Sequence, residues 1–355
     1  MNMDQADSTT PFIRNAWYVI AQSSEVTRVP MARTALGTSV VLFRALNGAV
    51  VALANRCCHR SFPLVHGTVD GDTLVCGYHG LRYDTTGRCV EIPMQKSVPS
   101  SLRVRAYQTA EMGPFVWIWM GERPPASDDA TPHQEWLDHP DWAVRVGYLH
   151  INGSYVHLHE NLLDLSHLSF LHAKTFGTPE YARTPVEMNC EGENLEVWRH
   201  VQCELPAIYA RPLGWTGARA MRSSGSRYVS PGLHVNTGIF RNLDLPDEAQ
   251  SPQPMVKVAQ LVTPESAVTT HYWTAQARNF ATTDAEMGEF MIKAQVEAFK
   301  EDAFALQQIT EMQTLAAAED IQEISIPTDK AGVLMRRRLK KLADLEGQSV
   351  QGSTR

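Results

Sequence analysis

Two short segments of the sequence each pair a cysteine with a histidine at metal-binding spacing. The first is Cys57-x-His59 and the second is Cys76-x-x-His79, with sixteen residues between them. Four tetrahedral ligands of this kind are enough for a single zinc ion. Two thiolates on one iron and two imidazoles on a second iron would instead hold a two-iron, two-sulfide cluster. The spacing therefore predicts a metal centre and leaves both kinds of centre open.

The residues that follow each histidine favour the iron–sulfur alternative. The first segment continues as HRSFPLVHG and the second as HGLRYDTTG, and both are typical of tight turns. The pair resembles the two cluster-binding loops of the Rieske family. The matching residues are Cys57, His59, Arg60, Gly67, Cys76, His79, Gly80, Tyr83 and Gly87. The resemblance implies that Cys57, His59, Cys76 and His79 hold a Rieske [2Fe-2S] cluster, whose imidazole ligands raise its potential so that it can accept electrons.

The remaining cysteines are expected to bind no metal. Cys58 is adjacent to His59 and cannot form the C-x-H arrangement with it, so Cys57 is the better ligand. Three others have no histidine or cysteine at ligand spacing, and we expect them to be buried apolar residues: Cys89, Cys190 and Cys203.

A second pair of histidines, His167 and His172, lies in a leucine-rich segment. Residues 157–172 carry leucines at helical spacing, which predicts a helix there. On an ideal helix, residues five apart point roughly 140° apart, so both histidines reach one metal only if the helix ends or bulges between them. Asp164 and His167 share a face at i,i+3, which suits a carboxylate that fixes the tautomer of a ligand histidine.

Two histidines and one carboxylate form the facial triad of non-haem iron oxygenases, which leaves open positions for dioxygen. The best candidate for the carboxylate is Asp302, in a predicted helix over 284–318 with Thr283 or Asp284 as its N-cap. Glu301 is the neighbouring alternative. By itself the H-x4-H spacing fits a structural histidine pair better, and the preceding Rieske motif is what favours iron.

Together, the motifs resemble the catalytic component of Rieske non-haem iron oxygenases, within the group of vanillate and dicamba O-demethylases and toluenesulfonate methyl-monooxygenase. The resemblance runs from RNAWYV at Arg14 through RCCHRS, CGYHG, CVEIP, VWIWMG, NLLDLSH, TPE and HYWTAQARNF to the ED at Glu301. It implies that His167, His172 and Asp302 hold iron, with Asn161 as a polar residue near it. It also implies that Asp164 bridges His167 to the cluster ligand His79 of a neighbouring subunit, and therefore a head-to-tail homotrimer.

The function implied by this resemblance is that of a terminal oxygenase. Electrons from NADH would pass through a separate reductase, of the FMN and [2Fe-2S] type, to the Rieske cluster and on to mononuclear Fe(II), where O2 is used. The expected reaction is hydroxylation of a methyl or methoxy group on a small, acidic aromatic compound, with loss of formaldehyde from a methoxy group. Ring dihydroxylation to a cis-diol is the alternative, and a Rieske electron-transfer protein is a third reading.

The elements that position these residues fall into two parts, and the expected fold class is α+β. Residues 12–125 contain short β segments, such as 40–43 and 116–119, and are expected to form an all-β Rieske [2Fe-2S] domain. Residues 126–345 are expected to form the catalytic domain, a helix-grip (START-like) antiparallel sheet with a long C-terminal helix and strands within 185–203 and 256–280. The tail, residues 346–355, is expected to be disordered.

Composition narrows the class of protein. The chain has 355 residues and a net charge of −7, from 32 Lys and Arg against 39 Asp and Glu, which argues against nucleic acid as a partner. The N-terminal residues lack a basic region followed by an apolar stretch, and no run of about 18 apolar residues occurs. We therefore expect a cytoplasmic protein that does not bind a membrane.

The sequence says less about the substrate. The pocket is expected within 205–240 and 256–275, with Asn236 and Gln260 as polar candidates. Four arginines could pair with a substrate carboxylate or sulfonate, although a surface location is the expected one: Arg211, Arg219, Arg222 and Arg227. A basic run over 336–341 is expected to be a solvated helix face, with docking of an acidic reductase as the alternative.

Overall fold

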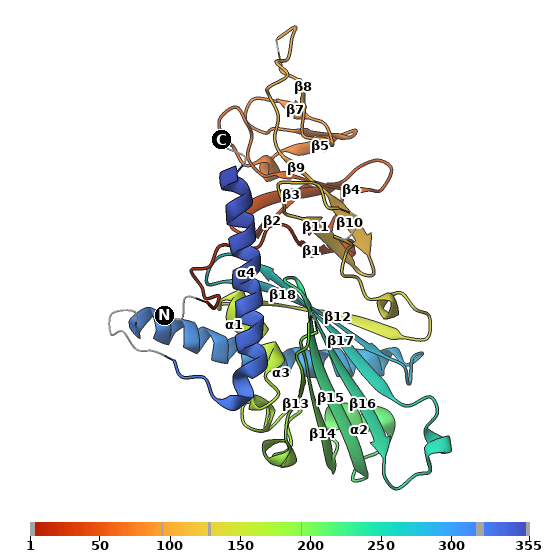
Figure 1. Cartoon of the computed structure of the whole chain (residues 1–355). Coiled ribbons are helices and arrows are strands. Elements are labelled where there is room, and N and C mark those ends of the chain that lie inside the picture. Colours follow the sequence, from red (N-terminus) through yellow and green to blue (C-terminus); the bar gives the residue numbers. More distant parts are fainter. Residues whose placement is uncertain (1–3, 94, 127–128, 193, 317–322, 353–355) are drawn as a thin grey trace. The chain divides into compact units, whose positions relative to one another are not determined.

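A computed structural model describes residues 4–93, 95–126, 129–192, 194–316 and 323–352 of the chain (Figure 1). The chain divides into two compact units. The β unit comprises Arg14–His133 together with Thr263–Ser266. The α/β unit comprises Met1–Ile13, Gln134–Val262 and Ala267–Arg355. The division near residue 133 lies within the Pro- and Asp-rich stretch 121–140.

In its described residues, the β unit contains eleven short strands in three sheets. One sheet has the order β1-β11-β10, the second β2-β3-β4-β9 and the third β5-β6-β7-β8. The strands are β1 (Trp17–Gln22), β2 (Met31–Ala35), β3 (Thr38–Arg44), β4 (Val50–Ala54), β5 (Thr68–Asp70), β6 (Thr73–Val75), β7 (Arg82–Tyr83), β8 (Cys89–Glu91), β9 (Ala106–Tyr107), β10 (Thr109–Met112) and β11 (Phe115–Trp119). The predicted strands 40–43 and 116–119 are confirmed within β3 and β11.

The α/β unit contains one seven-stranded sheet, in the order β12-β18-β17-β16-β15-β14-β13. Its strands are β12 (Ala143–Ile151), β13 (Glu187–Asn189), β14 (Glu196–Glu204), β15 (Arg219–Ser230), β16 (Leu233–Asn242), β17 (Met255–Pro264) and β18 (Thr270–Arg278). Its helices are α1 (Tyr155–Leu163), α2 (Ala207–Leu213), α3 (Ala285–Ala316) and α4 (Lys330–Gly352). The chain therefore has the expected α+β class, with an all-β part followed by an antiparallel sheet and a long helix.

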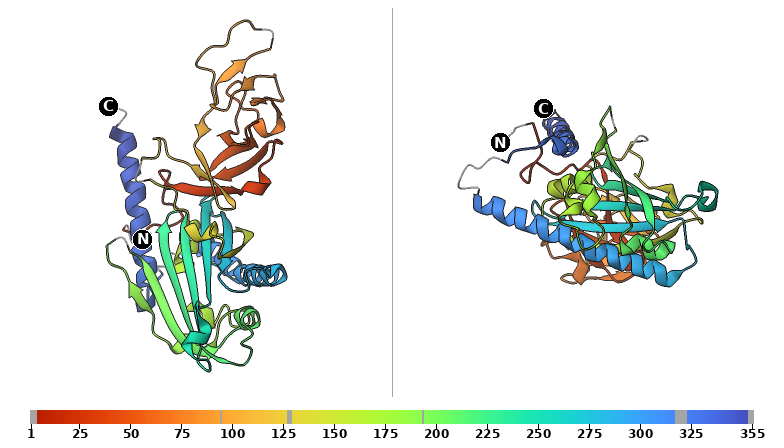
Figure 2. Two further views of the ribbon diagram at one scale, coloured as in Figure 1. Left: turned by 90° about the vertical axis from the view of Figure 1, so that its right-hand side faces the viewer. Right: turned by 90° about the horizontal axis from the view of Figure 1, so that it is seen from below.

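The long helix α3 lies against one face of this sheet (Figure 2). Gln295 of α3 donates to Thr274 Oγ1 at 2.7 Å and accepts from Gln276 Nε2 at 2.6 Å. Tyr272, two residues before Thr274, packs its ring on Phe299 of α3. Alternate residues of a strand point to the same side, so these contacts define one face of the sheet, which we call the inner face.

Helix α3 begins where the sequence predicts. Asp284 caps it, because its Oδ1 accepts the backbone N–H of Met287 at 2.9 Å. The helix runs to Ala316, and residues 317–318 of the predicted helix lie outside the described residues.

Helix α4 corrects the expectation of a disordered tail. It packs against α1 and continues to Gly352, so residues 346–352 are helical, whereas 353–355 lie outside the described residues. Helix α4 as a whole contains no proline and many Lys, Arg and Leu residues, which favour a helix.

The basic run over 336–341 is not a uniformly solvated face. Arg336 donates from Nε to the carbonyl of Ala6 and lies 3.4 Å from Glu160. Leu339 is fully buried. None of the helices in the described ranges is both long and apolar enough to cross a membrane.

Candidate metal centres

The two cysteine–histidine loops of the β unit share one backbone pattern. In the first loop the N–H of Ser61 donates to the carbonyl of Cys57 at 2.9 Å, and in the second the N–H of Gly80 donates to the carbonyl of Cys76 at 3.0 Å. Ser61 and Gly80 both have positive φ, 58° and 72°. Each loop therefore turns back sharply after its cysteine, as the two sequence segments predicted.

The two loops also approach each other closely. A Cβ atom on Gly77 would lie 2.5 Å from the carbonyl oxygen of His66, so only glycine fits at this crossing. The imidazole rings of His59 and His79 lie 4.6 Å apart between centroids. The structure thus brings the four predicted cluster residues to one place from loops on either side of β5 and β6.

The burial of these residues fits an iron–sulfur cluster. Cys57 and Cys76 are buried, whereas His59 and His79 are exposed. Burial raises the pKa of the Cys76 thiol, although backbone N–H groups of Tyr78 and His79 act against this. Buried thiolates need a cation beside them, and exposed imidazoles place the second iron at the protein surface. We infer that these four side chains are suited to hold the cluster, with its histidine side accessible to other proteins.

Tyr83 has a role that the motif alone did not indicate. Its hydroxyl lies 3.0 Å from Cys57 Sγ and 3.3 Å from the Sγ of the exposed Cys58. Hydrogen bonds to the sulfur ligands are one of the factors that set the potential of such clusters. Cys89 and Cys203 are buried as expected, but Cys190 is only half-buried, because β13 is the last strand of its sheet and leaves the following turn open to solvent.

In the α/β unit, the helix predicted over 157–172 is shorter than expected. Helix α1 ends at Leu163, and His167 lies in a separate 3-10 turn, His167–Ser169. The break follows from Asp164, whose Oδ1 accepts the backbone N–H of Ser166 at 2.6 Å and so competes with helix continuation. The two histidines therefore do not lie on one continuous helix. As their spacing requires, the helix ends before them, so that both can face one metal.

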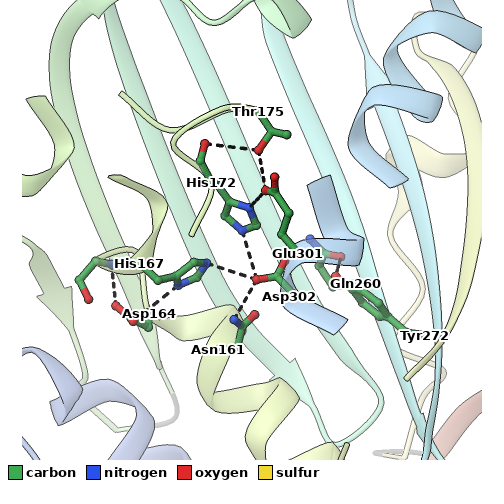
Figure 3. A network of polar contacts seen from close by, with 10 residues as sticks. Asn161, Asp164, His167, His172, Thr175, Gln260, Tyr272, Glu301 and Asp302 are labelled. Carbon is green, nitrogen blue, oxygen red and sulfur yellow. Dashed lines mark hydrogen bonds and ion pairs between the residues drawn. The ribbon is translucent and has the colours of Figure 1, made fainter. Parts of the chain in front are cut away.

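His167, His172 and Asp302 gather at one point (Figure 3). Each offers one ligand atom, and these atoms lie within 4.8 Å of one another. Asp302 Oδ1 lies 3.1 Å from His172 Nε2 and 3.5 Å from His167 Nε2. His172 and Asp302 are buried. Two imidazoles and one carboxylate are a donor set that suits Fe(II) and leaves coordination positions open.

Glu301 contacts the same site from a different direction. Its Oε2 accepts a hydrogen bond from His172 Nδ1 at 2.6 Å and from the hydroxyl of Thr175 at 2.8 Å. Glu301 therefore lies on the side of the imidazole away from Asp302, which makes Asp302 the better ligand. A carboxylate on Nδ1 keeps Nε2 available for a metal. The two acids also raise the pKa of His172, although burial acts in the opposite direction.

Asn161 and Asp164 support the other two members of the triad. Asn161 Nδ2 donates to Asp302 Oδ1 at 3.0 Å. Asp164 Oδ2 lies 3.5 Å from His167 Nδ1. Although burial acts to raise the pKa of Asp164, hydrogen bonds from His167 and Ser166 hold it below its usual value. Asp164 is thus an anion beside a candidate ligand histidine.

The substrate candidates lie on the sheet behind this site. Gln260 is buried and accepts the hydroxyl of Tyr272, and the two are drawn beside Asp302 in Figure 3. Asn236 Oδ1 accepts the hydroxyl of Ser226 at 3.1 Å. Gln260 pairs with His234, two residues before Asn236, so both candidates lie on the inner face.

The arginines depart from the sequence expectation at one position. Arg211, Arg219 and Arg227 are exposed as expected, but Arg222 is only 3% exposed. It lies on the inner face of the sheet because β15 places alternate residues there, whereas Arg227, an odd number of residues away, points to the other side. A second buried arginine, Arg199, was not singled out from the sequence.

Two family models match the chain. The Rieske [2Fe-2S] domain matches residues 16–105. The vanillate O-demethylase oxygenase C-terminal domain matches residues 151–345, which is more than half of the chain. The two matches fall on the β unit and the α/β unit.

Several known proteins match most of the chain. The chain is 36% identical over 299 residues to the iron–sulfur subunit of the toluene-4-sulfonate monooxygenase system of Comamonas testosteroni, covering 82% of this chain and 86% of that protein. It is 29% identical over 338 residues to the oxygenase component of dicamba O-demethylase of Stenotrophomonas maltophilia, covering 94% and 99%. The crystal structure of dicamba monooxygenase bound to 3,6-dichlorosalicylic acid superposes with a TM-score of 0.89 at 29% identity, covering 95% and 99%.

Proposed function

Because this chain belongs to the Rieske non-haem iron oxygenases with a vanillate O-demethylase type C-terminal domain, we propose that it hydroxylates a methyl or methoxy group of a small acidic aromatic compound. The observation that carries this proposal is the buried group of His167, His172 and Asp302 in the α/β unit. Members of the family are the terminal oxygenase components of multicomponent systems and use a Rieske [2Fe-2S] cluster, mononuclear iron and O2. We assign the cluster to a domain over 12–125 and the iron to a domain over 126–345.

In this proposal the side chains around the triad prepare it for metal. Glu301 and Thr175 hold His172 so that Nε2 faces Asp302. Asn161 donates to Asp302 and fixes its carboxylate. When bound, iron supplies the activation of dioxygen for insertion into a C–H bond. The Phe176 ring, 4.5 Å from the His172 ring, helps to exclude water on one side.

Electron delivery requires other proteins. Oxygenase components of this family receive electrons from a separate reductase, and we propose one of the FMN and [2Fe-2S] type that draws on NADH in the cytoplasm. The side chain of Asp164 is about one third exposed, although it lies 3.5 Å from His167, so it can contact another protein while it touches the iron site. We propose that it contacts His79 of a neighbouring copy in a head-to-tail homotrimer.

Two relatives suggest the reaction. One is named for toluene-4-sulfonate, which carries a methyl group, and another for O-demethylation of dicamba. Hydroxylation of a methyl group gives a stable alcohol, whereas hydroxylation of a methoxy group gives a hemiacetal that releases formaldehyde. Ring dihydroxylation to a cis-diol uses the same ligands and is the second candidate.

The test is metal analysis followed by product analysis. The protein purified without oxygen should contain three irons and two sulfides per chain, and two irons would indicate an electron-transfer protein. A zinc-only protein would overturn the proposal. With a matched reductase, methyl- and methoxy-arenes should give hydroxymethyl products or formaldehyde, and formation of cis-diols in their place would support the second candidate.

A further inference from the structure

Two arginines are buried side by side on the inner face of the sheet. Arg199 on β14 is 4% exposed and Arg222 on β15 is 3% exposed. Arg199 pairs with Ser224 and Arg222 pairs with Val201, so the two arginines are diagonal neighbours on one face. Lysine and arginine side chains are seldom buried without an anionic partner.

The contacts of Arg222 fix the plane of its guanidinium group. Nη1 donates to the carbonyl of Phe176 at 2.6 Å, and Nε donates to Ser224 Oγ at 3.2 Å. The rings of Tyr181 and Tyr209 lie 4.8 and 5.0 Å from Cζ. Among the described residues, the hydrogen bonds of Arg222 use Nη1 and Nε, and none uses Nη2.

Arg199 has fewer contacts. Its Nη1 donates to the carbonyl of Tyr181 at 2.6 Å, and its Nε is buried without a hydrogen-bond partner. Tyr181 also contacts Ser224 through its hydroxyl, at 2.6 Å. Both guanidinium groups therefore contact Tyr181, and Ser224 contacts both that tyrosine and Arg222.

Among the residues that the structure describes, no carboxylate forms an ion pair with either arginine. Within the described residues, neither arginine lies within 4.0 Å of a carboxylate oxygen. Asp164 acts on Arg199 from a greater distance, but its own contacts are with His167 and Ser166. A buried guanidinium without a counterion costs folding free energy, and a bound anion would offset that cost.

The pair lies next to the candidate iron site. The carbonyl of Phe176 accepts a hydrogen bond from Arg222, and the ring of Phe176 lies 4.5 Å from the ring of His172 at a tilt of 41°. The inner face that carries both arginines also carries Gln260 and the residues that pack on α3. Arg222 is thus joined to the triad through one segment, the loop that runs from His172 to Phe176.

We propose that Arg222, with Arg199 beside it, binds the carboxylate or sulfonate of the aromatic substrate. The inference rests on the proposed function, because it assumes that the methyl or methoxy group of the same molecule faces the iron. Planar guanidinium groups bind carboxylates and sulfonates through paired N–H donors, which gives orientation as well as affinity. The positioned anion would then direct the opposite end of the ring to the metal.

The experiment measures binding without turnover. Iron-loaded, oxidised protein is titrated calorimetrically, in the absence of reductase, with toluene-4-sulfonate, 4-methylbenzoate and the uncharged toluene-4-sulfonamide. Both anions should bind more tightly than the sulfonamide. In R222M the affinity for the anions should fall on the order of 10- to 100-fold, with little change for the sulfonamide. R222K keeps the positive charge but lacks the planar guanidinium group. Its affinity for the anions should lie between those of the wild type and R222M.

The matched control is R227M, because Arg227 is exposed on the same strand. Its anion affinity should equal that of the wild type. The inference is wrong if the wild type shows no preference for anions, if it binds neither anion, or if R222M and R222K keep the full preference. It is equally wrong if R222M weakens all three ligands alike and loses iron, because that result assigns Arg222 to anchoring the loop after His172.

Failure of this inference differs from failure of the proposed function. Protein that binds the anions through Arg222 but oxidises none of a panel of arenes contradicts the proposed reaction and leaves the anion site intact. Protein that oxidises methyl-arenes but shows no effect of Arg222 on anion binding contradicts only the anion site.

Discussion

His172 is held by two consecutive acids of one helix, each on a different ring nitrogen. Asp302 faces Nε2 and Glu301 faces Nδ1. The side chains of consecutive helix residues point about 100° apart. They reach the two different nitrogens of one imidazole because the edge of the ring faces the space between them. The sequence predicted that one of the two acids is a ligand, and the side of the ring each one meets distinguishes their roles.

At the residue scale we predict that Glu301→Gln weakens iron binding by about 10- to 100-fold. Glutamine can still contact Nδ1 but does not carry the charge that makes the imidazole a better donor. The measurement is iron affinity by competition with a chelator, with the EPR signal of the reduced Rieske cluster as an internal control. Glu297→Gln, on the exposed side of the same helix, should change neither value. Unchanged iron affinity in the Glu301 variant would contradict the role assigned to it.

Residue types and spacings, with the family resemblance, predicted the triad and its neighbours Asn161 and Asp164, which the structure brings together. They did not predict the hydrogen bonds of Glu301 and Thr175 beside His172, or that of Tyr83 to Cys57, because these contacts depend on where loops pack. Arg199 and Arg222 were harder still, because a charged residue in a strand normally indicates the solvent side.

At the element scale, the segment after α1 closes on itself around His172. The N–H of Gly177 donates to the carbonyl of His172 at 2.9 Å. A Cβ atom at position 177 would lie 1.8 Å from the carbonyl oxygen of Leu168. The candidate ligand is thus placed by a loop that tolerates no side chain at this closure.

We therefore predict that Gly177→Ala opens this loop and lowers both stability and iron content. Forcing a methyl group into a filled space costs about 1–3 kcal/mol. Thermal unfolding and metal analysis of the purified variant measure the two effects. Gly347→Ala serves as the control, since Gly347 is exposed on α4 and has open space around it, and this change should be neutral or slightly stabilising. Full iron content at normal stability in the Gly177 variant would disprove the closure argument.

A pair of buried histidines joins α1 to the sheet. His159 Nε2 donates to the carbonyl of Pro231 at 3.0 Å, which makes its Nδ1 the acceptor of a 2.6 Å hydrogen bond from His234 Nε2. Both rings are fully buried. Burial lowers the pKa of His159 to about 4, and it also lowers the pKa of His234.

The lowered pKa values of His159 and His234 predict that the folded protein loses stability in acid. Above pH 6.5 both imidazoles are neutral in the folded and the unfolded chain, and the contribution to stability is complete. As the pH falls from 6.5 toward 4, the unfolded chain gains protons that the folded chain does not bind, so the free energy of unfolding falls, by about 3 kcal/mol for His159. Denaturant unfolding at pH 7.5 and 5 measures this, and His159→Phe should reduce the slope. If the free energy of unfolding depends on pH in the same way in the variant, the histidine pair is not the cause of the acid sensitivity.

The elements themselves were largely predictable. The sequence predicted the strands within 185–203 and 256–280 and the whole of α3, but it did not locate β12, β15 or β16. The end of α1 and the length of α4 were not found, since the first depends on the Asp164 side chain and the second on packing against α1.

At the scale of the whole molecule, the proposed path of electrons can be tested with Asp164→Asn. The amide can still accept the N–H of Ser166, so the loop should keep its shape, but the anion beside His167 is lost. We expect iron and cluster contents to be unchanged and turnover to fall about tenfold or more. Asp344→Asn on α4 is the control. Among the described residues, the ion pair of Asp344 is with Lys340, one turn earlier on the same helix.

Complementation distinguishes transfer between copies from transfer within a chain. A Cys76→Ser variant should lack the cluster and an Asp164→Asn variant should lack the bridge. Assembled together, they should recover part of the wild-type activity if electrons pass from the cluster of one copy to the iron of the next. No recovery from mixed assemblies of confirmed composition would contradict the head-to-tail arrangement.

The iron site also joins segments that are far apart in the chain. His172 and Asp302 are 130 residues apart, and Asn161 is 141 residues from Asp302. Metal bound by both segments adds its binding free energy to that of the folded state, and the entropy of closing so long a loop grows only slowly with its length. Iron supply would therefore govern how long each copy survives proteolysis as well as whether it can work.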